Sequence, residues 1–253
     1  MFSLIFNWFN INNLLLRVNK VLSLIKYPRI FKLFFHGVVP SFEHEKAFNF
    51  LSDAKSLIDC GSNKGQFGLL SYILLDIKHY FAFDPILKAE KTFSFLKARG
   101  VQVHFKKYAL SDKNTFSNFY LTKRLDSSSL KKPKKYLKSI FSDVYLKNII
   151  KVETYPLDDF KNIVNSLPSP RILKIDVQGN EYELLKGAKK SLKMFKYIFI
   201  ECTNKDVYEN LEFYTRDIHR LLIKKDFELY MEYNFVKKNK QVIYSDRLYI
   251  LKE

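Results

Sequence analysis

From about residue 55 onward, short apolar runs alternate along the chain with longer stretches of mixed polarity. A run of about four to eight apolar or aromatic residues is typical of a buried strand, and apolar residues recurring every three or four positions are typical of a helix. The pattern predicts buried strands at Lys55–Cys60, Tyr80–Asp84, Val101–Phe105, Arg171–Asp176 and Tyr197–Glu201. It predicts helices over residues 66–75, 86–98, 181–192 and 207–224. This alternation predicts an α/β fold with a mostly parallel, doubly wound sheet.

Two stretches depart from the alternation. Residues 106–155 contain two strand-like runs, Phe116–Leu121 and Val152–Tyr155, on either side of a basic loop. At the end of the chain, the strand-like runs Phe227–Glu232 and Val242–Leu251 have no helix between them. We therefore expect a C-terminal antiparallel hairpin on the otherwise parallel sheet.

The first 35 residues carry apolar side chains at helical spacing, among them Leu4, Trp8 and Leu15, interrupted by asparagines and basic residues. No apolar run is long enough to cross a bilayer, and the basic start and cleavage site of a signal peptide are missing. We predict an N-terminal amphipathic helical extension over residues 1–45, followed by one domain over 46–253. Packing of the helix on the domain or on a partner subunit is favoured, and binding to a membrane surface is the alternative.

The 253 residues carry a formal net charge of +17, but the excess lysine is spread along the whole chain. The densest basic run comprises the lysines at 131, 132, 134, 135 and 138. It is either a solvated loop or a surface that attracts an anionic substrate. Only two cysteines, Cys60 and Cys202, are present, which excludes a disulfide framework and is typical of a reducing compartment. We expect a cytoplasmic protein, with peripheral contact at the inner membrane surface through residues 1–35 as the alternative.

Three of the seven glycines, Gly61, Gly65 and Gly68, lie in or just after the loop that follows the first predicted strand. The loop has neither the three-glycine spacing of a dinucleotide site nor the Gly-Lys-Ser/Thr of a P-loop. Asp59, at the end of the strand, would repel a pyrophosphate and attract a cation, so a sulfonium cofactor fits better than a phosphorylated one. Asp84 ends the second strand, where an acidic side chain commonly accepts hydrogen bonds from ribose hydroxyls.

A second group of charged residues follows the later strands. Lys174 and Asp176 share one face of a strand, Glu181 lies in the first turn of the next helix, and Glu201 ends the next strand. Because the carboxyl ends of parallel strands meet at one edge of a sheet, we expect these four side chains to face one crevice. They form either a catalytic or substrate-binding site or a plain ion-pair network.

Several motifs occur in a fixed order along the chain. The most specific is KIDVQGNEYELLKGA at residues 174–188, which ordinary Rossmann domains do not share. The others are IDCGSNKGQF, FDP, YALSD, the stretch Ser127–Leu130, IFIE and SDRLYIL. Together, from about Lys55 to Leu251, the chain resembles the FkbM family of methyltransferases. The resemblance implies a Rossmann-like methyltransferase fold, S-adenosylmethionine as the cofactor, and O-methylation of a hydroxyl on a sugar, glycan or related small molecule.

The resemblance also implies roles for single residues. The residues expected to contact the methionine end of the cofactor are Asp59, Gly61, Asn63, Gly65 and Phe67. Asp84 would bind the ribose, and Ser111 or Asp112 would lie near the adenine. The chain departs from the usual family pattern at three positions, with Ser62 in place of Ala, Asp84 in place of Glu and Gln178 in place of Glu.

Methyl transfer from a sulfonium to a hydroxyl needs an oriented acceptor oxygen and gains from a nearby base. Asp176 is the first candidate for that base, and Glu181 and Glu201 are second candidates. Lys174 is a candidate to hold a carboxylate or a substrate oxygen. A divalent metal bridging Asp176 and Glu201 is a further hypothesis, since hard cations take carboxylate ligands. The cysteines and histidines show no metal-site spacing.

Other functions compete with this interpretation. The charge suggests a nucleic-acid methyltransferase, but Tyr136 is the only aromatic residue inside the basic run, which disfavours nucleic acid as a partner. A non-catalytic domain that binds the cofactor, or a membrane through residues 1–35, is a second alternative. The expected partner is a small-molecule or glycan acceptor, which is anionic if the basic run faces it. The insertion at 106–155 is expected to shape the acceptor site.

Overall fold

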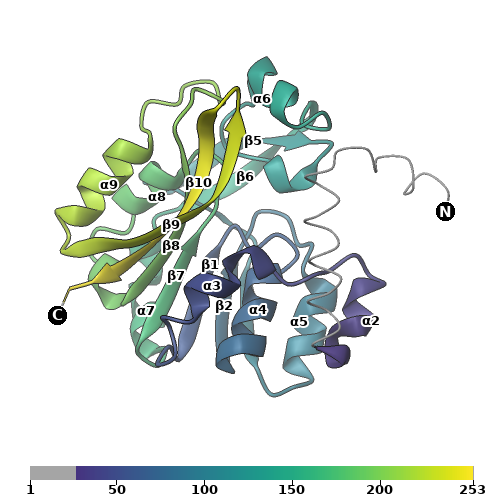
Figure 1. The fold of residues 1–253 in the computed structure, drawn as a ribbon, viewed down its shortest axis with the longest axis vertical. Helices are drawn as coiled ribbons and strands as arrows, with labels where there is room; N and C mark the ends of the chain where they lie inside the picture. The colour runs from purple at the N-terminus through teal and green to yellow at the C-terminus, as the bar shows by residue number, and fades with distance from the viewer. Residues whose placement is uncertain (1–26, 253) are drawn as a thin grey trace.

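The computed structural model describes residues 27–252, and its core is a seven-stranded sheet (Figure 1). The strand order is β3-β2-β1-β7-β8-β10-β9. The bounds of the strands are β1 Ser56–Cys60, β2 His79–Phe83, β3 Gln102–Lys106, β7 Arg171–Ile175, β8 Tyr197–Thr203, β9 Phe227–Lys238 and β10 Gln241–Leu251. Neighbouring strands from β3 to β8 are parallel, whereas β10 is antiparallel to both β8 and β9. The predicted fold class is confirmed, including the antiparallel C-terminal hairpin.

Helices cover both faces of this sheet (Figure 1). Successive side chains of a strand point to opposite faces, so Leu57 of β1 joins one hydrophobic core and Ile58 joins the other. The helices of the first core are α3 Glu45–Phe48, α4 Gln66–Leu75 and α5 Glu90–Lys97. Those of the second core are α7 Lys161–Ser166, α8 Glu181–Lys186 and α9 Thr215–Ile223. Because both faces of β1, β2, β7 and β8 are buried, these strands are largely apolar runs, which the sequence pattern detected.

A smaller sheet, β4-β6-β5, forms in the stretch that breaks the alternation. The bounds of its elements are β4 Ala109–Leu110, β5 Thr115–Thr122 and β6 Leu146–Tyr155, with α6 Lys135–Ile140 between β5 and β6. The two strands predicted here are confirmed, and both are longer than predicted. The helix α6 was not predicted, because the lysine-rich run around it has the composition of a loop.

The basic run before and within α6 is not simply solvated. Three of its lysines each pair with a carboxylate from a distant part of the chain: Lys131 with Glu183, Lys132 with Glu209, and Lys134 with Asp206. The side chain of Lys131 is largely buried, at 12% exposed, whereas those of Lys132 and Lys134 are 43% and 36% exposed and remain in contact with solvent. Ion pairs at a surface add little to stability, but they reduce the charge available to an outside anion.

The helix predicted over residues 207–224 is shorter in the structure, since α9 begins only at Thr215. Tyr208 is fully buried in a separate hydrophobic cluster, which holds the preceding stretch away from the helix axis. The carboxylate of Asp217 accepts the N–H of Tyr214 at 3.1 Å and caps the start of the helix. Side-chain burial far from the helix therefore overrides the local helical pattern.

The helix predicted over residues 181–192 ends at Lys186 in the structure. The N–H groups of Lys190 and Ser191 donate to the carboxylate of Asp158, and that of Ser191 also donates to the carbonyl of Ala188 at 3.1 Å. A tertiary hydrogen-bond acceptor thus replaces the last predicted turns of the helix.

The predicted N-terminal helix lies largely outside the described residues. The described part of the extension contains η2 Pro28–Ile30, α2 Phe31–Phe34 and η3 Phe42–His44 before α3. Ile30 and Leu33 are buried in the core that α4 and α5 also form, so this segment packs on the domain. Within residues 27–252, no helix has the length and apolar character needed to cross a membrane.

Candidate functional site

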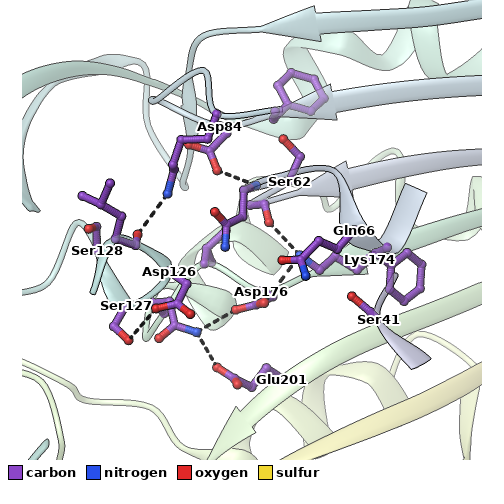
Figure 2. Close-up of a pocket in the computed structure, with 18 of the residues that line it drawn as sticks. Ser41, Ser62, Gln66, Asp84, Asp126, Ser127, Ser128, Lys174, Asp176 and Glu201 are labelled. Atoms are coloured by element: carbon purple, nitrogen blue, oxygen red, sulfur yellow. Dashed lines mark hydrogen bonds and ion pairs between the residues drawn. The ribbon is translucent and has the colours of Figure 1, made fainter. Parts of the chain in front are cut away.

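A cavity of about 330 Å³ opens at the carboxyl ends of the parallel strands, where β1 and β7 lie side by side. The strand order reverses between these two strands, and ligands of open α/β sheets bind at that point. The volume lies in the range of small-molecule sites. Figure 2 shows Asp84 at one end of the cavity and Glu201 at the other, with Lys174 and Asp176 between them. We call these the Asp84 end and the Glu201 end.

The loop after β1 builds the Asp84 end. Gly61 has φ 82°, and a Cβ there would lie 1.9 Å from the carbonyl oxygen of Asp176, so only glycine lets the loop pass this close to β7. The N–H of Asn63 donates to Asp84 Oδ2 at 2.9 Å, and the N–H of Ile86 donates to Oδ1 at 2.8 Å. Burial raises the pKa of Asp84, although these hydrogen bonds oppose the shift. Each carboxylate oxygen keeps a second acceptor site for a ligand hydroxyl.

Ser62 lies in the same loop, and its side chain contributes to the cavity lining beside Phe67. Its residue is 3% exposed, and its hydroxyl has no hydrogen-bond partner among the described residues. A buried hydroxyl left without a partner costs about 1–3 kcal/mol. A polar ligand that supplies a partner is therefore favoured at this position.

Lys174 links the two ends of the cavity. Its ammonium donates to the carbonyl oxygen of Gly61 at 2.7 Å and pairs with Asp59 at 3.2 Å and Asp176 at 3.5 Å. Burial opposes the charge, but the two aspartates raise the pKa of Lys174 above its ordinary value. Lys174 is therefore a permanent cation that fixes the glycine loop and holds Asp176 at the cavity wall.

Gln178 joins the two acidic side chains of the Glu201 end. Its amide nitrogen donates to Asp176 Oδ1 at 2.7 Å and to Glu201 Oε2 at 2.8 Å, and its amide oxygen accepts the hydroxyl proton of Tyr208 at 2.8 Å. Residue 178 also has φ 58°, and its carbonyl accepts the hydroxyl of Ser129 at 2.5 Å. The Gln178 amide thus lies between the two carboxylates, and the described residues contain no group of three or more acidic, histidine or cysteine side chains suited to a metal. A metal bridging Asp176 and Glu201 stays a prediction.

Asp176 and Glu201 lie in different electrostatic surroundings. The side chain of Asp176 is 38% exposed at the cavity and has Lys174 beside it. Burial, followed by repulsion from Asp176 and Asp246, raises the pKa of Glu201 well above its ordinary value. Glu201 therefore favours its protonated form, and Asp176 is the carboxylate of this pair that is placed to take up a proton.

Glu181 does not face the crevice, so that expectation is wrong. Its carboxylate turns back into its own loop and accepts the N–H groups of Val177 and Gly179 at 3.0 Å. Burial raises its pKa to about 7, although these hydrogen bonds oppose the shift. Glu181 thus supports the loop that carries Gln178 and is not part of the cavity lining.

Most of the residues around this cavity lie within a known protein family domain. The chain matches the methyltransferase FkbM domain over residues 59–229, which is more than half of its length and includes both ends of the cavity. The protein belongs to the FkbM methyltransferase family. The cofactor of an FkbM domain is S-adenosylmethionine.

Individual proteins share between 12% and 28% sequence identity with this chain. The 2-O-methyltransferase NoeI of Sinorhizobium fredii is 28% identical over 160 residues, which cover 60% of this chain and 65% of the relative. The aligned region is thus slightly less than two thirds of that relative. The structure of M. capricolum TrmK with S-adenosyl-homocysteine has a TM-score of 0.46 at 12% identity, covering 84% of this chain and 69% of that chain. An rRNA methylase from Streptococcus thermophilus has a TM-score of 0.43 at 13% identity, covering 83% and 97%.

The residues of the Asp84 end fit this cofactor. The carboxylate of Asp84 offers acceptors for ribose hydroxyls, and the orphan hydroxyl of Ser62 offers a polar contact inside the cavity. Gly61, Asn63 and Phe67, which the resemblance assigned to the cofactor, also line the cavity. The shorter side chain of Asp84, in place of the family's usual Glu, is held in position by two backbone N–H groups.

Two other residues assigned to the methionine end do not line the cavity. Asp59 is fully buried, accepts the hydroxyl of Tyr80 at 2.8 Å and pairs with Lys174, so it acts on the cavity only through that lysine. A Cβ on Gly65 would lie 3.0 Å from Thr92, which shows that this glycine serves the packing of α4 on α5. The expectation of direct contact is wrong for both.

Ser111 and Asp112, the residues expected near the adenine, form contacts with other parts of the chain. The hydroxyl of Ser111 accepts from the amide of Asn180 at 3.2 Å, and Asp112 pairs with Lys186 at 3.0 Å. Neither residue lines the cavity, so their place near the adenine stays a prediction. The residues just before them, Tyr108–Leu110, line it instead, because β4 runs past its edge.

Sequence reasoning missed the part of the lining that lies outside the FkbM match. Ser41 and His44 of the N-terminal segment line the cavity, as do Asn234, Val236 and Tyr244 of the C-terminal hairpin. A single histidine in an aromatic segment and an asparagine in a strand carry no local signal of a site. The stretch 124–128 also lines the cavity, and here the motif at Ser127–Leu130 was the signal.

Proposed function

We propose that this protein transfers the methyl group of S-adenosylmethionine to a hydroxyl oxygen of a sugar, a glycan or a related small molecule. The observation that carries the proposal is the placement of Asp176 in the same cavity as Asp84 and the glycine loop, on an FkbM domain. The similarity to a 2-O-methyltransferase supports the choice of oxygen as the methylated atom.

The bound cofactor would supply a methyl group on a positively charged sulfur, with the electron pair of the breaking bond going to that sulfur. The residues of this chain orient the acceptor and take up its proton. The carboxylate of Asp176 accepts the hydroxyl proton as the oxygen–methyl bond forms, which is general base catalysis. Lys174 and Gln178 hold that carboxylate from two sides, so the base is already positioned before the acceptor binds.

The structure weakens the support for an anionic acceptor. Lys131, Lys132 and Lys134 have carboxylate partners, and none of the five lysines of the basic run lines the cavity. The cavity as a whole is lined by five acidic side chains and three basic ones, Lys88, Arg124 and Lys174. The proposed acceptor is therefore a neutral hydroxyl compound.

The function is tested by two measurements on the full chain. Calorimetry with S-adenosyl-homocysteine is expected to show binding, and Asp84→Asn is expected to weaken it about tenfold or more, because hydrogen bonds to a charged acceptor contribute about 1.5–3 kcal/mol. Incubation with methyl-labelled S-adenosylmethionine and a panel of sugars and glycans, followed by mass spectrometry, is expected to give an O-methylated product. Binding of S-adenosyl-homocysteine without methyl transfer to any sugar or glycan of the panel would refute the proposed acceptor class.

A further inference from the structure

A second, smaller cavity of about 110 Å³ adjoins the Glu201 end. Lys174, Asp176 and Glu201 line both cavities, and so do Glu43, His44 and Asn234. The space next to Asp176 therefore continues into this second cavity, which we call the side cavity. Its volume leaves room for several water-sized groups, which suits a small polar substituent better than a whole sugar ring.

The outer wall of this side cavity comes from segments outside the FkbM match. His44 belongs to η3, Tyr233 and Asn234 belong to β9, and Asp246 belongs to β10. The matched domain ends at residue 229 and supplies only the inner wall, from β7 and β8. The terminal segments therefore supply the rest of the wall of this side cavity.

His44 is held in one orientation in this wall. Its Nδ1 forms a hydrogen bond with the hydroxyl of Tyr233 at 2.8 Å. The rings of Phe67 and Phe199 meet the imidazole edge-on, with centroids 5.2 and 6.1 Å away. The ring cannot turn without breaking these contacts, so the side of the imidazole that lines the cavities is fixed.

Asn234 is directed into the cavity by an irregularity of the hairpin. The pairing register between β9 and β10 shifts between Tyr244 and Asp246, and Asn234 has φ 52°. Bulges of this kind redirect a side chain next to a site. The Asn234 amide donates to Asp246 Oδ2 at 2.5 Å, and both residues line the side cavity.

We propose that the side cavity binds a neutral, hydroxyl-bearing substituent of the acceptor, next to the oxygen that is methylated, with His44, Asn234 and Asp246 as its hydrogen-bond partners. The inference rests on the proposed function, because it assumes that Asp176 marks the reacting oxygen. The wall offers donors and acceptors together, and a hydroxyl is both. A carboxylate substituent would lie beside the charged carboxylate of Asp176, and an apolar one would make no use of the donors and acceptors of this wall.

The first arm of the test compares three acceptors that differ at one carbon: methyl glucoside, methyl glucuronide and methyl 6-amino-6-deoxyglucoside. Binding to the full chain with S-adenosyl-homocysteine present is measured by saturation-transfer NMR. The neutral glucoside is expected to bind at least about tenfold more tightly than the glucuronide. Equal or tighter binding of the glucuronide or of the amino sugar overturns the inference, as does a lack of binding by all three.

The second arm uses Asn234→Gly, which removes the amide and still permits the left-handed backbone. The matched control is Asn239→Gly, since Asn239 has φ 50° and lies exposed at the tip of the same hairpin. The Asn234 variant is expected to raise the KM of an accepted neutral glycoside about fivefold, as one lost hydrogen bond does, with kcat and the affinity for S-adenosyl-homocysteine unchanged. The control is expected to match the wild type, and His44→Gln is expected to raise the KM as well.

The outcomes separate this inference from the proposed function. If the wild type methylates a glycoside but both Asn234→Gly and His44→Gln keep its KM, the side cavity does not serve the acceptor and only this inference fails. If either variant weakens S-adenosyl-homocysteine binding in parallel with acceptor binding, the side cavity is not an acceptor subsite. If the wild type binds S-adenosyl-homocysteine but methylates no glycoside, the proposed acceptor class fails and this inference fails with it.

Discussion

The two ends of the cavity are built in different ways. The Asp84 end combines the loop after β1 with the end of β2, and its shape depends on backbone groups: the left-handed Gly61, the left-handed Asn63 and the N–H groups that hold Asp84. The Glu201 end is assembled from side chains of separate elements, including His44 and Asn234, which are 190 positions apart. The difference means that residues at the Glu201 end can change without disturbing the loop that holds the cofactor. We therefore expect substitutions at the two ends to separate cofactor binding from acceptor chemistry.

The sharpest separation is expected from Asp176→Asn. An amide cannot take up the acceptor proton, so kcat should fall by about 100-fold or more. The affinity for S-adenosyl-homocysteine should stay within about twofold, because the Asp84 end is left intact. Labelled methyl transfer and calorimetry measure the two quantities, with the exposed Asp159→Asn as the matched control. Full turnover by the Asp176 variant would show that the base lies elsewhere.

Lys174→Met is expected to break both ends at once. It leaves Asp59 fully buried without its cation, and removing one partner of a buried pair destabilises a protein by about 3–5 kcal/mol. Urea unfolding measures the free energy, and the double variant Asp59→Asn with Lys174→Met should recover a large part of the loss. A single variant as stable as the wild type would mean that the pair does not support the loop.

Glu181→Gln tests how Glu181 stabilises the loop that carries Gln178, through the pH dependence of the free energy of unfolding. The fold raises the pKa of Glu181 to about 7, so its stabilising contribution is present below its ordinary pKa of 4.5 and is lost as the pH rises through 7. Glutamine does not titrate, so the variant should gain stability relative to the wild type over this window, on the order of 2–3 kcal/mol. Urea unfolding at pH 5 and pH 8 measures the change, with the exposed Glu212→Gln as control. A difference that is the same at both pH values contradicts the assignment.

A smaller effect is expected from Gln178→Glu. The substitution removes the donor shared by Asp176 and Glu201 and places a third carboxylate between them. Like charges raise one another's pKa, so the acid limb of the kcat profile should move to higher pH, and kcat at pH 7 should fall by about tenfold. S-adenosyl-homocysteine binding should not change. An unmoved pH profile would show that Gln178 does not set the charge of this pair.

Local pattern was sufficient for some features and insufficient for others. The helix 66–75 and the buried strands were predictable because continuous burial on both faces leaves an unbroken apolar run. The helix predicted from Val207 failed because the burial of Tyr208, beneath Gly179 and against Gln178, is a long-range contact. Asp59 was predicted to touch the cofactor because its place at a strand end is visible in the sequence. Its partner Lys174, 115 positions later, decides where its carboxylate goes.

By itself, the sequence determined the α/β fold, the family, the glycine loop and the position of Asp84, since each depends on residues close together along the chain. Only the tertiary structure decided which charged side chains face the cavity. It turned Glu181 into its own loop, placed Gln178 between two carboxylates, and brought His44 beside the C-terminal hairpin. The physical reason is that a buried charge or hydrogen-bonding group takes whichever partner the packing brings within reach, and sequence distance does not limit that choice.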